Sequence, residues 1–287
     1  AGVPLSELDL ASLQGKAYLN DAVIDAVLKL RLRRGVNHDT RSGVHIMSSL
    51  FYKQLCSIER PKSGGDMVRR MLPAATAVRG WTKRVDLFSK RLIIVPVNHA
   101  MHWSLAVIVQ PASWAAHMRA WAASDREGTV AERLLSVNKH SKAVAEPCIF
   151  LLDSLGIHRP KDICRALRAW LVWEFVWVEG LQELPANLPP QCLLPYMSLQ
   201  VRQQDNSYDC GIYLLCNAEL VLSAAANDSL RVPFERKQGL HVWHTAQKRL
   251  LARVLLSFKE STLNPKLARD VRKRLHRLLV AMKSPTL

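Results

Sequence analysis

Apolar side chains recur every three or four residues between positions 20 and 34, which is typical of one face of an amphipathic helix (Val23, Ile24, Val27, Leu28 and Leu32). Asn20 or Asp21 can cap the start of this helix. Similar spacing predicts further helices over residues 161–178, 210–222, 243–258 and 265–283. In the first of these, aromatic and β-branched residues replace the helical pattern near Trp173, so we expect the helix to break there.

Short segments rich in β-branched residues predict three strands in the middle of the chain, at residues 92–97, 103–109 and 148–152. Pro96 has no N–H to donate, so the first strand should lie at the edge of a sheet or end early. Residues 111–147 separate the second and third strands and contain Pro111, Gly128 and mixed charge. This stretch predicts an insertion outside the core, with a helix of its own around residues 114–124.

The composition is that of a globular protein, with 49% hydrophobic and 22% charged residues in a chain of 287. The sequence contains no run of 18 uncharged apolar residues and no secretory signal in its first twenty positions, so we expect no membrane insertion and an intracellular location. The first residue is Ala1 rather than Met, and we therefore expect a piece of a longer protein.

Cysteine spacing and net charge narrow the chemistry. The six cysteines form no C-x-x-C pair and H-E-x-x-H does not occur, so the sequence indicates neither a zinc site nor a disulfide framework. A formal net charge of +16 favours an acidic partner, such as nucleic acid, an anionic membrane face or an acidic protein. Nucleic-acid binding would use the basic residues of the last predicted helix, which could equally form a solvated face (Lys266, Arg269, Arg272, Lys273, Arg274 and Arg277).

Cys210 is the candidate nucleophile. The thiolate is the attacking form of cysteine, and the N-terminus of a helix beside an imidazole stabilises it. Cys210 follows the polar, turn-forming residues QQDNSYD and precedes the apolar run GIYLLC, so it should lie where a loop enters a buried helix. The alternative is a small buried core residue, a description that also fits Cys216 six positions later.

The candidate base and its orienter lie at the ends of two predicted strands. His102 stands immediately before the strand at 103–109, where a rigid sheet would hold a catalytic group accurately. It could instead only cap the strand end, and His99 is a nearby competitor. Asp153 ends the apolar strand CIFLLD and could accept the second N–H of an imidazole, which would fix its tautomer, or could simply open a turn.

Six segments together resemble the sentrin-specific (ubiquitin-like-specific) cysteine protease family, which removes the small modifier SUMO from proteins. They occur in the family's order and span about residues 18 to 220: YLNDAVID, SSLFYKQL, VRGWTKR, VPVNHAMHWSLAVI, CIFLLDSLG and RQQDNSYDCGIYLLC. The resemblance implies an α+β, papain-like fold, in which a central helix bearing the cysteine packs against a mixed sheet bearing the histidine and aspartate. We expect one catalytic domain over residues 1–287, with a core at about 5–260 and a basic helical extension at about 262–287.

The resemblance also implies the catalytic roles, carried over onto the matching positions. Cys210 becomes the nucleophile, His102 the general base and Asp153 its orienter, while the side chain of Gln204 helps to bind the oxyanion. No metal or cofactor is implied. A catalytically inactive binding protein is disfavoured, because all four positions hold chemically competent residues.

Family resemblance further implies a substrate site. In the family two tryptophans form a narrow tunnel for the Gly-Gly tail of the modifier, and the matching positions here are Trp103 and Tyr18. The second wall is therefore aromatic but smaller, and it has a polar tip. Asp21 matches a family position that faces a basic residue of the modifier.

The implied partners are SUMO and SUMO-conjugated proteins, and the implied location is the nucleus, with the cytoplasm as the alternative. The long segment 111–147 and the phrase EPCIFLLDSL resemble the branch of the family that edits poly-SUMO chains. Open alternatives are a protease for ubiquitin or another ubiquitin-like modifier, an acyltransferase with the same triad, and a basic nucleic-acid-binding module with a weak contact through the C-terminal helix.

Overall fold

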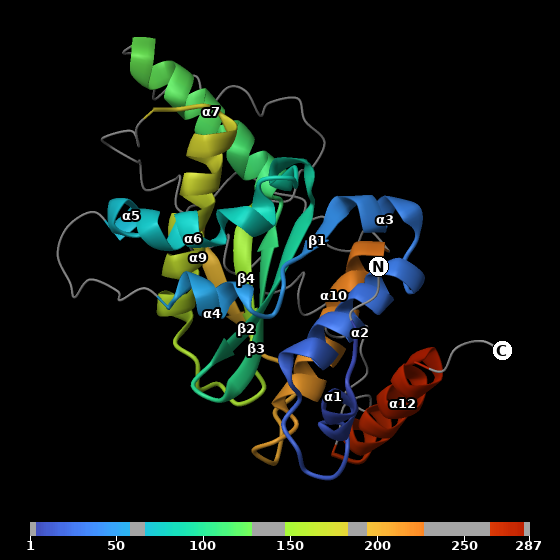
Figure 1. Ribbon diagram of the computed structural model, residues 1–287. Coiled ribbons are helices and arrows are strands. Elements are labelled where there is room, and N and C mark those ends of the chain that lie inside the picture. Colours follow the sequence, from blue (N-terminus) through green and yellow to red (C-terminus); the bar gives the residue numbers. More distant parts are fainter. Residues whose placement is uncertain (1–3, 58–66, 128–146, 183–193, 227–264, 284–287) are drawn as a thin grey trace.

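The computed structural model describes residues 4–57, 67–127, 147–182, 194–226 and 265–283, and its centre is a five-stranded mixed sheet (Figure 1). The strands lie side by side in chain order: β1 (Val44–Ile46), β2 (Leu92–His99), β3 (His102–Val109), β4 (Cys148–Leu152) and β5 (Tyr196–Leu199). The edge strands β1 and β5 run parallel to their neighbours, whereas β2, β3 and β4 are antiparallel to one another in turn. The three predicted strands and the α+β class are confirmed, and β1 and β5 were not predicted.

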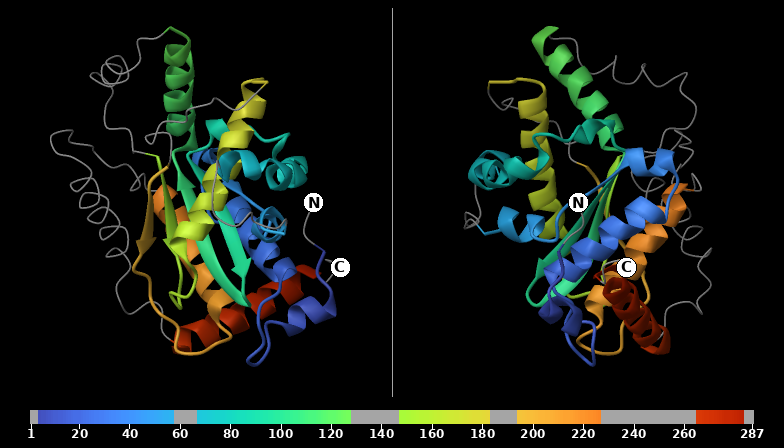
Figure 2. Two further views of the ribbon diagram at one scale, coloured as in Figure 1. Left: turned by 90° about the vertical axis from the view of Figure 1, so that its left-hand side faces the viewer. Right: turned by 45° about the vertical axis from the view of Figure 1, so that its right-hand side comes forward.

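Helices bury both faces of the sheet. One face carries α4 (Phe51–Leu55), α6 (Leu72–Thr82), α7 (Pro111–Glu127) and α9 (Pro160–Val178), with α5 (Met67–Arg70) and the 3₁₀ turn η1 (Leu87–Ser89) beside them. The other face carries α2 (Asp21–Arg34), α10 (Cys210–Ala226) and α12 (Pro265–Lys283), with α1 (Glu7–Ala11) and α3 (His38–Gly43) nearby (Figure 2). Because both faces are covered, the central strands are continuous apolar runs and show no polar alternation.

The predicted helices on the second face are confirmed where the structure describes them. The side chain of Asn20 accepts a hydrogen bond of 3.0 Å from the amide of Val23, so Asn20 and not Asp21 caps α2. α10 begins at Cys210, and α12 covers the predicted segment 265–283. The predicted helix at 243–258 lies outside the described residues. Within the described ranges, the helices are all too short or too polar to cross a bilayer.

The predicted break near Trp173 is wrong, because α9 continues without interruption to Val178. Trp173 donates its indole N–H to the carbonyl of Val68 at 2.6 Å, and the buried carboxylate of Glu174 accepts from the Thr82 hydroxyl. Packing against α5 and α6 therefore holds this aromatic, β-branched segment in a helix. Tertiary contacts here override a weak local preference.

Two further predictions are corrected. β2 is an interior strand that runs to His99, so Pro96 marks neither an edge strand nor an early end. The proline is tolerated because β1 pairs only with the beginning of β2, which leaves Pro96 with a neighbouring strand on one side only. The stretch after β3 does carry its own helix, α7, but the first turns of that helix belong to the core, where Trp114 and Met118 are fully buried. The prediction that this stretch lies outside the core is therefore wrong for the first turns of α7.

Candidate active site

A strained hairpin places His102. The turn between β2 and β3 consists of Ala100 and Met101, with φ of 50° and 60°, and the pair His99 and His102 closes it. Two consecutive left-handed residues suit the twist of a tight hairpin, but glycine or asparagine usually fills them. For other residues this conformation costs roughly 1 kcal/mol each, so the surrounding structure must hold the turn in place. His102 is the first residue of β3 and is buried.

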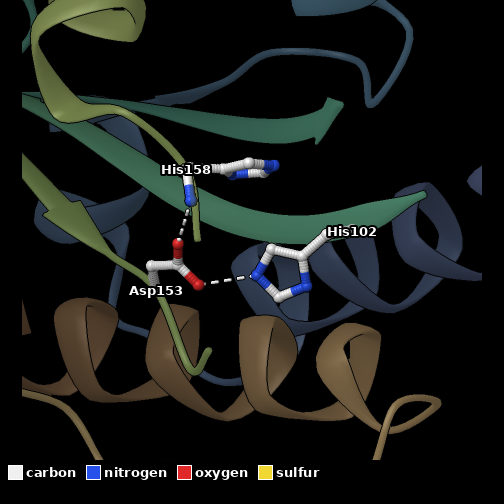
Figure 3. Close-up of side chains that lie close together, drawn as sticks. All are labelled: His102, Asp153 and His158. Atoms are coloured by element: carbon white, nitrogen blue, oxygen red, sulfur yellow. Dashed lines mark hydrogen bonds and ion pairs between the residues drawn. The ribbon is translucent and has the colours of Figure 1, made fainter. Parts of the chain in front are cut away.

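Asp153 lies directly after β4 and faces His102 (Figure 3). Its Oδ1 is 2.6 Å from Nε2 of His102 and accepts from the amide of Leu155, while its Oδ2 accepts from the amide of His158 at 2.9 Å. Burial alone would raise the pKa of Asp153, but these donors hold it well below its usual range. The side chain is therefore a fixed carboxylate aimed at one nitrogen of the imidazole.

The second ring nitrogen of His102, Nδ1, is not used by Asp153. Nδ1 is buried and makes no hydrogen bond within the described residues. Burial lowers the pKa of His102, but the interactions with Asp153 and Cys210 outweigh it and raise the pKa to about 9. Asp153 thus contacts one nitrogen of the imidazole, and Cys210 acts electrostatically on the same ring.

His158 supports both partners, and the sequence reasoning missed it. Its Nε2 donates to the carbonyl of His99 at 2.9 Å, and its Nδ1 lies 2.7 Å from the Ser104 hydroxyl. Burial lowers the pKa of His158, so the ring is neutral, and the Ser104 hydroxyl is then the donor to Nδ1. One side chain thus ties down the strained hairpin, while its main-chain amide holds Asp153.

His102, Asp153 and His158 also form a cluster of potential metal ligands, with atoms within 4.8 Å of one another. Both ring nitrogens of His158 are already hydrogen-bonded, and so is one of His102. A metal ion would have to break this network to bind. The donor set therefore fits a hydrogen-bonded catalytic group better than a metal centre.

Cys210 is the first residue of α10 and is a free, buried thiol. The side chain of Asn206 accepts from the amides of Tyr208 and Asp209, and this turn leads the chain into the helix. Gly211 closely approaches the segment before α2, because a Cβ at this position would lie only 2.8 Å from Cβ of Leu19. The glycine after Cys210 is thus required by packing.

Gln204 is buried on the loop before Cys210. Its Oε1 accepts from the Ser154 hydroxyl at 2.6 Å, and its Nε2 donates to the carbonyl of Asn206, also at 2.6 Å. An amide nitrogen carries two hydrogens, so one remains available for a developing oxyanion. Ser154 adjoins Asp153 and thereby links the base to the oxyanion donor.

The three predicted substrate residues lie in one region. The buried indole of Trp103 donates to the carbonyl of Leu19 at 2.9 Å, which fixes the ring beside the segment that holds Tyr18. Tyr18 is 44% exposed. Asp21 begins α2, and its Oδ1 is a buried atom without a hydrogen-bond partner among the described residues.

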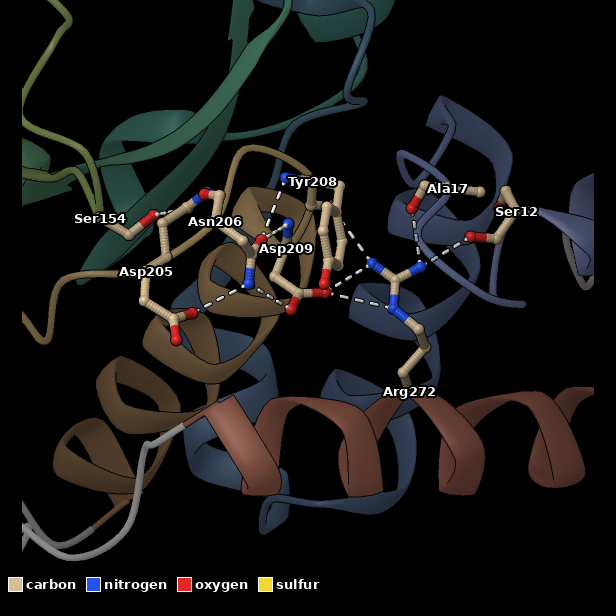
Figure 4. Close-up of polar contacts among 9 residues, drawn as sticks. Ser12, Ala17, Ser154, Asp205, Asn206, Tyr208, Asp209 and Arg272 are labelled. Carbon is tan, nitrogen blue, oxygen red and sulfur yellow. Dashed lines mark hydrogen bonds and ion pairs between the residues drawn. The ribbon is translucent and has the colours of Figure 1, made fainter.

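One predicted binding residue lies elsewhere. Arg272, named above among the basic residues of a nucleic-acid-binding face, is 4% exposed and bonds to Asp209 (Figure 4). Helical spacing could have indicated this, because Arg272 shares one face of α12 with the buried Ala268 and Leu279. By contrast, His158 lies in a loop, and its spacing indicates no role.

Comparison with known proteins places these features in a family. The model of the "Ulp1 protease family, C-terminal catalytic domain" matches residues 17–240. The chain is 32% identical over 226 residues to a probable ubiquitin-like-specific protease 2B of Arabidopsis thaliana, covering 78% of this chain and 21% of the relative. It is 29% identical over 283 residues to human sentrin-specific protease 7, covering 86% and 26%.

Two solved structures share the fold. The crystal structure of a de-sumoylating protease superposes with a TM-score of 0.59 at 18% identity, covering 97% of this chain and 87% of the other. An Ulp1 SUMO protease with its catalytic cysteine oxidised to a sulfenic acid superposes with a TM-score of 0.53 at 17% identity, covering 98% and 85%. The chain spans only about a fifth to a quarter of the length of the curated relatives named above. Since the family model covers most of the chain and the fold agrees, the chain belongs to the Ulp1 protease family and contains its C-terminal catalytic domain.

Proposed function

We propose that this chain is a cysteine protease that cleaves peptide and isopeptide bonds after the C-terminal Gly-Gly of SUMO. The observation that carries the proposal is the arrangement around His102, whose Nε2 is held 2.6 Å from Asp153 while Cys210 acts on the same ring from the start of α10. A protonated imidazole beside a cysteine at a helix N-terminus is the pairing that nucleophilic thiol catalysis requires.

The reaction follows from these positions. The Cys210 thiolate attacks the carbonyl carbon of the terminal glycine, and Gln204 with the main-chain amide of Cys210 donates to the oxyanion, a donor role worth roughly 3 kcal/mol. The C–N bond then breaks, and His102 gives its proton to the leaving amine. Water, deprotonated by His102, hydrolyses the thioester and regenerates the thiol. Asp153 holds the ring in place during both transfers.

Support for the substrate comes from the residues beside Cys210 and from the relatives. Trp103 donates to the carbonyl of Leu19, the residue after Tyr18, so the two predicted tunnel residues lie on neighbouring segments. Asp21, at the start of α2, carries a carboxylate that suits a basic group of a modifier. The sequence relatives are named as sentrin-specific and ubiquitin-like-specific proteases.

Covalent capture tests this proposal. SUMO with a thiol-reactive group at its C-terminus should form a stable adduct with the parent chain at Cys210, and none with Cys210→Ala. Replacing the last Gly of the tail by Ala should prevent capture, because aromatic walls exclude a side chain by overlap. Capture by a ubiquitin probe but not by a SUMO probe would show that the substrate is ubiquitin and not SUMO. Absence of capture by every modifier would reject the protease assignment and leave the acyltransferase alternative.

We also propose that poly-SUMO chains are the preferred substrate, on the basis of the phrase EPCIFLLDSL, which resembles the chain-editing branch of the family. The parent chain should then cleave a SUMO–SUMO isopeptide bond faster than a SUMO precursor. Equal rates would contradict the preference. A location in the nucleus stays a prediction, as does a weak nucleic-acid contact, which no longer includes Arg272.

A further inference from the structure

A single guanidinium on the C-terminal helix joins three separate segments of the chain. Arg272 of α12 donates from Nη2 to Oδ1 of Asp209 at 2.7 Å and to the carbonyl of Tyr208 at 3.2 Å. Its Nη1 donates to the carbonyls of Ser12 and Ala17 at 2.9 and 2.8 Å, and its Nε contacts Asp209 again at 3.2 Å (Figure 4). All three nitrogens are therefore engaged by groups far away in the sequence.

The Arg272–Asp209 pair is buried and its hydrogen bonds are satisfied. The two side chains are 5% and 2% exposed. The second oxygen of Asp209 accepts from the amide nitrogen of Asn206 at 3.0 Å. Desolvating two charges is expensive, and such a pair is a weak source of net stability compared with apolar packing. Its geometry is specific, however, because the planar fork of arginine demands a defined arrangement of acceptors.

One of the stretches that Arg272 holds, Tyr208 and Asp209, leads directly into the candidate site. Asp209 precedes Cys210, and the carbonyl of Asp209 accepts the amide of Tyr213 in the first turn of α10. Asn206, which bonds to Asp209, accepts from the Gln204 side chain. The contacts with Arg272 therefore fix the approach to the nucleophile and, through Asn206, the oxyanion donor.

The other stretch that Arg272 holds, Ser12 and Ala17, leads to the predicted substrate residues. Ala17 immediately precedes Tyr18 and Leu19, and the Leu19 carbonyl anchors Trp103. Leu19 also packs against Gly211 at the start of α10. The guanidinium thus sets the relative position of the nucleophile helix and the aromatic segment beside it.

We propose that Arg272 is a positioning residue for Cys210, acting through Asp209, and that the functional catalytic unit extends to the C-terminal helix. The matched family region ends at residue 240, so it does not include this contact. The inference rests on the proposed role of Cys210 as nucleophile. Without Arg272, Asp209 would be a buried carboxylate without its cation, and the turn that leads into Cys210 would lose the contacts that hold it.

The test compares Arg272→Gln, Arg272→Lys and the matched control Arg274→Gln, an exposed arginine on the same helix, all in the full chain. Two quantities are measured: the alkylation rate of Cys210 by iodoacetamide, followed by mass spectrometry, and kcat and KM on SUMO with a fluorogenic C-terminal group. Arg272→Gln should slow alkylation and kcat by about tenfold or more with little change in KM, since small displacements of a reacting group can cost up to about a hundredfold. Arg272→Lys should recover part of both rates, and Arg274→Gln should match the parent.

Parent values of alkylation and kcat in folded Arg272→Gln would overturn the proposal, even if its melting temperature fell. If Arg272→Gln does not fold, Asp209→Asn takes its place, and parent rates in that variant would overturn the proposal equally. Alkylation needs no substrate. Failure of the parent chain to hydrolyse SUMO would therefore reject the proposed function and still leave the positioning role measurable.

Discussion

The candidate site has two sides, the proposed base side at His102 and Asp153 and the proposed nucleophile side at Cys210. Different interactions hold these two sides in place. His102 and Asp153 project from adjacent strands of the sheet, and their support comes from a neutral ring, His158, only five residues beyond Asp153. Cys210 begins a helix whose entry depends on an ion pair with Arg272, and the same guanidinium reaches back to the first twenty residues. One side is held by hydrogen bonds between the β2–β3 hairpin and the loop after β4, and the other by an ion pair and hydrogen bonds that reach the first twenty residues.

The two sides should therefore be disrupted by different changes. Neutral hydrogen bonds to His158 fail when the ring takes up a proton, so the base side should be sensitive to acid. A buried ion pair is instead sensitive to loss of either partner, because the remaining charge is left uncompensated. Four substitutions test this contrast.

Cys210→Ala should reduce hydrolysis of a SUMO substrate by at least about a thousandfold, because removal of a nucleophile abolishes the covalent route. Cys216→Ala is the matched control. Burial raises the pKa of Cys216 to about 12, so this cysteine stays an unreactive thiol, and its loss should leave kcat within about twofold of the parent. A larger loss of kcat with Cys216→Ala than with Cys210→Ala would show that Cys210 is not the nucleophile.

Asp153→Asn should lower kcat by about a hundredfold to ten-thousandfold while the protein stays folded, because asparagine keeps the shape but no longer fixes the imidazole. The sign of the pH effect follows from the charge. The carboxylate helps to raise the pKa of His102 to about 9, so its removal lets that pKa fall. The alkaline limb of kcat, where His102 loses the proton for the leaving amine, should move toward neutral pH. An unshifted limb would contradict the assigned pairing.

Gly211→Ala should disturb the nucleophile side, because its Cβ would lie 2.8 Å from Leu19. We expect a loss of about 1 to 3 kcal/mol in the free energy of unfolding, which is typical of overpacking, and a lower kcat as α10 shifts. Gly80→Ala in α6 is the control, since nothing lies within 4 Å of a Cβ there, and it should be neutral or slightly stabilising. Denaturant unfolding measures the free energy of unfolding of both variants. Equal losses in the two variants would contradict the close packing of Gly211 against Leu19.

His158→Gln should have the smallest effect, because an amide can donate to the His99 carbonyl and accept from Ser104 as the imidazole does. His158→Ala should cost about 1 to 3 kcal/mol of stability for the unsatisfied groups it leaves. The pKa of His158 lies below its usual 6.5, so the native state binds fewer protons than the unfolded chain there. The parent should therefore lose stability as pH falls below about 6.5, and His158→Gln should lose less; identical pH profiles of the melting temperature would contradict this.

Several elements could be predicted from local sequence alone. The apolar spacing of residues 20–34 predicted α2, the β-branched runs predicted three of the strands, and the polar-to-apolar change at Cys210 predicted the start of a buried helix. The family motifs further indicated the pairing of His102 with Asp153, whose side chains do meet. These features are readable because periodicity and chain order record which face of an element is buried.

Other features were decided only by the tertiary structure. Trp173 stays in a helix because Val68 and α6 pack around it, against its local preference. His158 and Arg272 belong to a loop and to a basic helix in the sequence, yet both are buried polar groups whose partners come from distant segments. A hydrogen-bond partner far along the chain leaves no periodic trace, because which two segments meet is set by how the helices pack on the sheet. The sequence therefore determined the groups that can do the chemistry, and the packing decided which polar side chains hold them in place.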